Sequence, residues 1–246
     1  MVRLGGFFVK RQEISDAIKD VLPVLLAVIP FGAVFGALAV ERGLPVPEVL
    51  FASATIFAGA SQYAMLDLMG QKVPAWAIVL AVFAINFRHV LYSAAVGRKM
   101  GDFNIWQKAL VFFLLVDPLY AASEARARTD VLKPASVFTY GVIIYCTWMS
   151  SNLVGVLFGR LIENPAAFGF DFVLPIYFVG LVMGFRKATN FLPVLIVSVA
   201  VSILVWLTLG TPWHISLGGF AGLLTAAALS KPTRNAETDG KVTARV

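Results

Sequence analysis

Long apolar stretches alternate with short polar loops along most of the chain. A helix of about 20 apolar residues, rising 1.5 Å per residue, crosses a hydrocarbon core of roughly 30 Å. The loops are too short to hold a soluble domain, so the pattern predicts an all-α, polytopic integral membrane protein whose chemistry lies within the membrane. We distinguish about eight hydrophobic segments, at residues 21–40, 49–69, 74–97, 103–123, 135–159, 166–185, 191–209 and 213–229.

The two ends of the chain differ from this membrane domain, which spans residues 21–230. Residues 10–20 combine charged side chains with a helix-like apolar pattern and have no small-residue cleavage site. We therefore expect residues 1–20 to be a cytoplasmic segment with an interfacial helix rather than a cleaved signal. Residues 231–246 are polar and have almost nothing to bury, which predicts a disordered cytoplasmic tail.

The composition independently places the chain in a bilayer. Hydrophobic residues make up 59% of it, charged residues only 14%, and the mean hydropathy is +0.82. One soluble core cannot bury that much apolar surface. The net charge of +6 is small for a nucleic-acid-binding protein and lies largely in tails and loops. Cys146 is the only cysteine, which excludes an intrachain disulfide, and we predict no metal and no cofactor.

The distribution of Lys and Arg orients the chain in the cytoplasmic membrane. With both termini cytoplasmic, positive residues are in excess on the inside, as the positive-inside rule requires. If all segments cross, however, Arg98, Lys99 and Lys108 fall outside. Making the segments at 49–69 and 103–123 re-entrant moves this loop inside, and both segments contain polar or helix-breaking residues. The orientation is thus better defined than the number of crossings.

A short sequence pattern that occurs twice suggests an inverted repeat. The stretch Val21-Leu22-Pro23 precedes Gly32 at the same interval as Val173-Leu174-Pro175 precedes Gly184. The two copies lie in segments that run in opposite directions, and transporters built this way commonly bind substrate between their repeats. Helix breaks are expected at Pro30, Gly32, Pro118 and Pro175.

The third segment carries polar side chains at mid-membrane. A charge there is costly, so Asn86, Arg88 and His89 mark either a substrate path or a structural ion pair. Asn86 and His89 share a helix face with Tyr92, whereas Arg88 lies about 100° round from that face. We expect Arg88 to pair with Asp117 or Asp171.

The second segment contains a run of small residues followed by a polar pair. Gly59 and Ala60 precede Ser61 and Gln62, so a helix here can break or let another backbone approach. A break would expose backbone N–H groups and a helix N-terminus to a carboxylate. The alternative is a small-residue packing face with one interhelical hydrogen bond.

Together, several stretches resemble the AzlC family of branched-chain amino acid permeases. They are FAGASQ at 57–62, NFRHVLYSAAV at 86–96, the pair Asp117-Pro118, and GFDFVLP at 169–175. The resemblance covers about residues 14–229. It implies the large subunit of a two-component exporter of branched-chain amino acids, paired with a small AzlD-type membrane protein.

An aliphatic amino acid needs groups for its carboxylate and ammonium and an apolar pocket for its side chain. Residues 59–62 can hold the carboxylate, Asn86, His89 and Tyr92 can add polar contacts, and Asp117 can accept from the ammonium or carry a proton. His89 can also couple protons, or merely bond a carbonyl. The sequence has no Gly-rich loop that ends in Gly-Lys-Ser/Thr, so we expect a proton-coupled or otherwise gradient-driven carrier.

Two other classes compete with a carrier. A channel for small polar solutes also suits small residues and a polar midplane. An intramembrane hydrolase would use Ser61, His89 and Asp117, but Gln62 stands where a nucleophile elbow needs a small residue. We therefore expect no enzyme.

Overall fold

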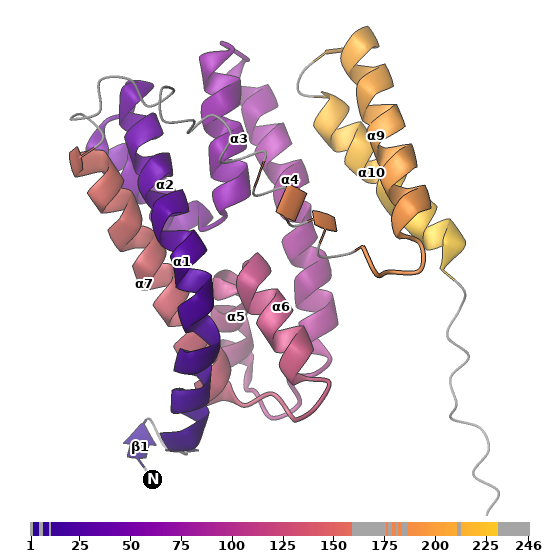
Figure 1. Cartoon of the computed structure of the whole chain (residues 1–246). Coiled ribbons are helices and arrows are strands. Elements are labelled where there is room, and N and C mark those ends of the chain that lie inside the picture. The colour runs from indigo at the N-terminus through magenta and orange to yellow at the C-terminus, as the bar shows by residue number, and fades with distance from the viewer. Residues whose placement is uncertain are drawn as a thin grey trace, which may run out of the picture. The chain divides into compact units, whose positions relative to one another are not determined.

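The computed structural model describes residues 2–4, 7–9, 11–158, 176, 179–180, 182–183, 186–210 and 213–230. The chain forms two compact units, Met1–Gly180 and Leu181–Val246, which we describe separately. The first unit contains β1 (Val2–Leu4), β2 (Phe7–Val9), α1 (Arg11–Glu41), α2 (Val46–Ile56), α3 (Gly59–Gly70), α4 (Ala75–Gly97), α5 (Ile105–Leu114), α6 (Asp117–Arg126) and α7 (Pro134–Phe158) (Figure 1). The second contains α9 (Phe191–Thr208) and α10 (Trp213–Leu229).

The predicted helical fold is confirmed, apart from a small antiparallel hairpin of β1 and β2 before α1. Among the described residues, four helices are long and apolar enough to cross a membrane: α1, α4, α7 and α9. The expected number of about eight segments is not confirmed. The segments at 49–69 and 103–123 are each divided into two short helices, and most of 166–185 lies outside the described residues.

Helix α1 is continuous from Arg11 to Glu41, so residues 11–20 are its first turns and not a separate helix. The breaks expected at Pro30 and Gly32 are wrong. Pro30 removes one backbone hydrogen bond, but it lies inside the helix, where packing on α7 holds the flanking turns together. The break expected at Pro118 is confirmed, because α6 begins immediately before it. Pro175 lies outside the described residues.

Helices α1 and α7 pack in parallel through small residues. Gly32 lies against Ser151, where a Cβ on the glycine would stand 2.8 Å from the serine Cβ. One turn further along both helices, Gly36 faces the backbone of Asn152, and Gly155 faces the backbone of α1 at Ala33. Such close backbone approach is typical of helix association in membranes.

Helices α2 and α3 form a hairpin that enters and leaves the bundle at one end. The first residue of α3, Gly59, lies beside Phe31 and Trp148, away from the ends of α1 and α7. Toward the other end of α3, the carbonyl of Leu66 accepts a 2.8 Å hydrogen bond from Nη1 of Arg42, just beyond the end of α1. Helix α3 therefore returns to the end at which α2 began.

Helices α5 and α6 form a second hairpin at the opposite end. Lys99, just after α4, pairs with Glu124 near the end of α6 at 2.5 Å. The last residue of α6, Arg126, pairs at 2.6 Å with Asp20 in the first third of α1. Asn104 and Gln107 cap the start of α5 with a reciprocal pair of hydrogen bonds. Helix α4 thus crosses between the two hairpins.

This arrangement supports the re-entrant alternative drawn from the charges. The loop between α4 and α5 lies at the same end as the start of α1, together with the loop between α6 and α7. It also reveals an inverted repeat within the first unit, because a long helix followed by a broken hairpin occurs twice, with opposite direction (α1 to α3, then α4 to α6). The predicted repeat with residues 173–184 falls largely outside the described residues.

The second unit is an antiparallel pair of helices. Ser198 Oγ donates to the carbonyl of Gly218 and Ser202 Oγ donates to that of His214, both at 2.8 Å. Gly222 also packs against Ser198. The pair is held by small residues and interhelical hydrogen bonds, as is usual in lipid.

Candidate functional site

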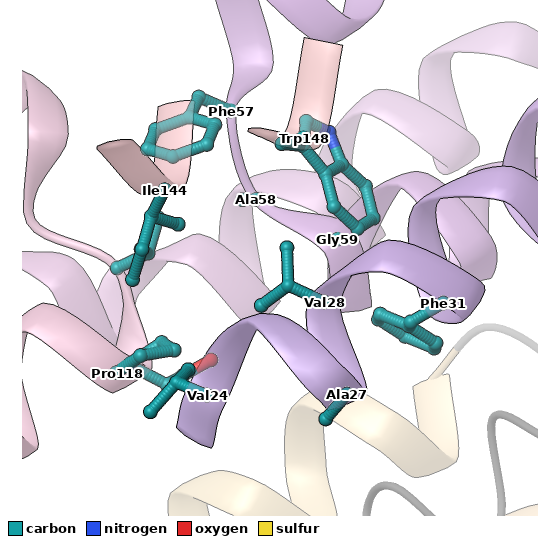
Figure 2. A pocket seen from close by; sticks show the side chains of 12 residues that line it. Val24, Ala27, Val28, Phe31, Phe57, Ala58, Gly59, Pro118, Ile144 and Trp148 are labelled. Atoms are coloured by element: carbon teal, nitrogen blue, oxygen red, sulfur yellow. The ribbon is translucent and has the colours of Figure 1, made fainter. Parts of the chain in front are cut away.

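A cavity of about 110 Å³ lies where the two hairpin tips meet the middles of α1 and α7 (Figure 2). Apolar side chains supply most of its wall, and Asp117 is the charged one. The lining residues are Val24, Ala27, Val28 and Phe31 of α1, Phe57, Ala58 and Gly59 of the first tip, Val116, Asp117 and Pro118 of the second, and Ile144 and Trp148 of α7.

The first tip is a break in the helix at Phe57 and Ala58. Phe57 leaves the helical conformation (φ 10°, ψ 58°), and its ring packs edge-on against Tyr145 with the centroids 4.9 Å apart. The Ser61 hydroxyl donates to the Ala58 carbonyl at 2.9 Å. Gly59 allows close packing here, because a Cβ at this position would lie 3.0 Å from both Phe31 and Trp148. The predicted break is confirmed.

A buried chain of hydrogen bonds lies next to this tip. Gln62 Nε2 donates to Ser53 Oγ at 3.2 Å, and Ser53 donates to Asn152 Oδ1 at 3.0 Å. The Asn152 amide in turn donates to the carbonyl of Trp148. The side chains of Ser53, Gln62 and Asn152 are fully buried. Gln62 therefore ties α3 to α2 and α7, which is the structural alternative considered for this polar pair.

The second tip places Asp117 at the first residue of α6, followed by Pro118. One oxygen of its carboxylate, Oδ1, pairs with Arg88 Nη1 at 3.1 Å and accepts from the Tyr92 hydroxyl at 2.8 Å. The Tyr92 ring stacks on Tyr120 with a centroid separation of 4.1 Å. The side chains of Arg88 and Asp117 are 20% and 11% exposed. A carboxylate at a helix N-terminus is also favoured by the helix dipole.

Helix α4 carries three further buried polar atoms. Asn86 Oδ1, Arg88 Nε and His89 Nε2 have no hydrogen-bond partner within the part of the chain that the structure describes. The His89 ring lies edge-on to Tyr92, with centroids 5.8 Å apart. Neither Asn86 nor His89 lines the cavity.

The structure thus brings only part of the predicted site to the cavity. Gly59, Asp117 and Pro118 line it, whereas Ala60, Ser61 and Gln62 do not. Asp171 lies outside the described residues. The expected separation of Arg88 from Tyr92 is wrong: the two are four positions apart on a helix and converge on Asp117. Of the two partners considered for Arg88, the structure shows Asp117.

Sequence reasoning missed the contributions of α1 and α7, above all Phe31 and Trp148. A signal was present for Trp148: it stands near the middle of an apolar segment, whereas membrane tryptophans usually gather at the interfaces. The described residues hold no group of three His, Cys, Asp or Glu side chains able to bind a metal ion.

Comparison with known proteins agrees with this membrane architecture. The chain is 28% identical over 221 residues to the inner membrane protein YgaZ of Escherichia coli K12, covering 86% of this chain and 88% of that protein. An uncharacterized membrane protein of Archaeoglobus fulgidus is 32% identical over 139 residues, 56% of this chain and 58% of the relative. One from Helicobacter pylori strain 26695 is 25% identical over 185 residues, 73% of this chain and 80% of the relative.

No solved structure matches the chain. The family described as AzlC protein matches residues 23–162, which contain both hairpins, α4, α7 and the greater part of α1. This span includes every residue that lines the cavity. The chain is therefore a membrane protein that belongs to the AzlC family.

Proposed function

We propose that the protein is a secondary transporter that exports branched-chain amino acids across the cytoplasmic membrane. The observation that carries the proposal is the cavity between the two hairpin tips, which combines a largely apolar wall with one carboxylate. Broken helices that meet near the midplane are the usual setting of substrate sites in transporters with inverted repeats.

Each part of an aliphatic amino acid has a counterpart in this cavity. Asp117 accepts from the ammonium group, and the start of α3 at Gly59 offers backbone N–H groups to the carboxylate. The side chains of Val24, Val28 and Ile144 surround the aliphatic part. A volume of about 110 Å³ lies below the range of drug-sized pockets, in keeping with a small solute.

The proposed orientation follows the positive-inside rule. The end of the first unit at which α1 begins also holds Arg98, Lys99, Arg128 and Lys133, and we assign it to the cytoplasm with both termini. Export then draws on an ion or proton gradient, with Asp117 and His89 as the candidate proton carriers. As implied by the family resemblance, the chain acts with a small AzlD-type membrane subunit.

Counterflow in proteoliposomes tests the proposal. We expect vesicles that hold the chain and its small subunit, preloaded with leucine, to take up labelled leucine, valine and isoleucine transiently. Asp117→Asn should abolish this uptake while the protein remains folded. Asp67→Asn is the matched control, because Asp67 is exposed at the far end of α3 and accepts a local hydrogen bond from Gln71. Channel currents without counterflow, or full counterflow by Asp117→Asn, would contradict the proposal.

A further inference from the structure

We infer that the indole N–H of Trp148 and the first turn of α3 together form the subsite for the substrate's carboxylate. This inference rests on the proposed function and adds a residue that holds one end of the amino acid. Trp148 is 5% exposed, yet its Nε1 has no hydrogen-bond partner within the described residues. A buried indole N–H normally finds a partner, so an unpaired one beside a cavity points to a ligand.

The position of the ring supports this role. Trp148 lines the cavity and lies over Gly59: a Cβ on Gly59 would stand 3.0 Å from Cη2 and 3.4 Å from Cζ2 of the indole (Figure 2). Nε1 lies one ring position beyond this contact, because it is attached to the ring carbon next to Cζ2. Contacts with Phe31 and Phe35, at centroid distances of 5.7 Å and 6.0 Å, fix the ring from the side of α1.

The start of α3 lacks the usual cap. Its N-cap residue, Ala58, has no side chain that can accept from the first-turn N–H groups. Ser61 does not fill this role, because its hydroxyl donates to the Ala58 carbonyl. The residues around the break, Phe57, Ala58 and Ala60, are buried. Uncapped N–H groups in a buried position need an acceptor, and an anion is the most favourable one.

The two features select the same chemistry. An indole N–H and a helix N-terminus can only donate, so their shared ligand must be an acceptor, and the helix dipole favours a negative charge. The other hairpin tip supplies a carboxylate, Asp117, which favours a cation. One wall for an anion and another for a cation suit a zwitterion. We therefore assign the α-carboxylate to Trp148 and α3, and the ammonium to Asp117.

Two ligands separate this role from simple packing. Leucine and 3-methylbutylamine share an aliphatic chain and an ammonium group, but only leucine has the carboxylate. Calorimetric titration of the full-length chain together with its small subunit in lipid nanodiscs should show Trp148→Phe weakening leucine binding at least about tenfold, as expected for the loss of one hydrogen bond to a charged group. Binding of the amine should be unchanged. Trp76→Phe, at a position 64% exposed, is the control.

Unchanged leucine binding by Trp148→Phe, or equal weakening of both ligands, would overturn the inference, since the ring would then serve only to pack. If the wild-type chain binds neither ligand, the proposed function itself fails.

A measurement on the unaltered site covers the case in which the variant does not fold. In the ¹H–¹⁵N spectrum, the indole signal of Trp148 should shift with leucine but not with the amine. It is identified as the signal that remains in each variant that replaces one of the exposed tryptophans Trp76, Trp106, Trp206 and Trp213. A signal that does not shift with leucine would equally refute the role.

Discussion

The ion pair between Arg88 and Asp117 should dominate the effect of Arg88→Ala. The pair spans 3.1 Å, and its side chains are only 20% and 11% exposed. Removing one partner of a buried pair costs about 3–5 kcal/mol, because the other charge remains without compensation. Asp117 still accepts from the Tyr92 hydroxyl at 2.8 Å and still lies at the start of α6. The helix dipole contributes about 0.3–1 kcal/mol, so we expect a loss of about 2–4 kcal/mol.

A second substitution should reverse this loss. Arg88→Ala leaves the charge of Asp117 without its ion-pair partner, and Asp117→Asn removes that charge. The amide oxygen of the asparagine can still accept from Tyr92. The double variant should therefore lie within about 1 kcal/mol of the wild type in free energy of unfolding. Its transport should nevertheless be absent, because the proposed ammonium acceptor is gone. Stability and activity thus separate in the same protein.

Denaturant titration in mixed micelles, followed by tryptophan fluorescence, measures the two singles and the double. Arg98→Ala is the control: Arg98 caps the same helix, is exposed and forms no ion pair within the described residues. Its effect should stay within about 0.5 kcal/mol. An Arg88→Ala protein as stable as the wild type, or a double variant no more stable than that single, would refute the reasoning. Arg88 would then belong to the transport machinery.

Three further predictions concern the helix contacts and the site. Gly155→Ala should destabilise the protein by about 1–3 kcal/mol in the same titration, because its methyl group meets the backbone of α1, whereas Gly219→Ala, with nothing within 4 Å, should be neutral or stabilising. Gly59→Leu should abolish counterflow with the protein still inserted, because the side chain fills the space between two aromatic rings and the cavity; full activity would exclude the first tip from the site. His89→Ala should lower transport but not abundance, and the reverse result on a membrane immunoblot would give His89 a structural role.

The sequence predicted the broken segments for a physical reason that is visible in the structure. Gly59 and Pro118 are residues whose backbone chemistry interrupts helices, and both breaks occur next to them. Pro30 has the same chemistry and no break, because tertiary packing on α7 outweighs the one hydrogen bond lost. Local propensity therefore marks where a helix can break, and the neighbouring helices decide where it does.

The site was harder to predict, because it joins residues from four parts of the chain. The polar residues of the third segment drew attention by their cost in lipid, yet Asn86 and His89 lie outside the cavity wall. Phe31 and Ile144 gave no local signal, since an apolar residue in an apolar segment has no distinguishing pattern. Only the parallel packing of α1 on α7 brings these two side chains to the same cavity.

The contacts that hold the two hairpins differ in strength. The first hairpin is fixed by buried, uncharged hydrogen bonds, from Gln62 to Ser53 and from the Tyr63 hydroxyl to the carbonyl of Phe31 at 2.7 Å. Breaking these bonds leaves buried polar groups unsatisfied. The outer end of the second hairpin is held by two ion pairs with exposed partners, Arg126 with Asp20 and Lys99 with Glu124.

Pairs of this exposed kind contribute about 0–1 kcal/mol each. The buried oxygens Ser123 Oγ and Glu124 Oε1 on the same hairpin also have no partner within the described residues, which lowers the cost of moving α6 further. In a transporter that exposes its site alternately to the two sides, the element with the weaker restraints moves. The end of α6 near Asp20 should therefore open first, and because α6 carries Asp117 at its other end, that movement reaches the charged wall of the cavity directly.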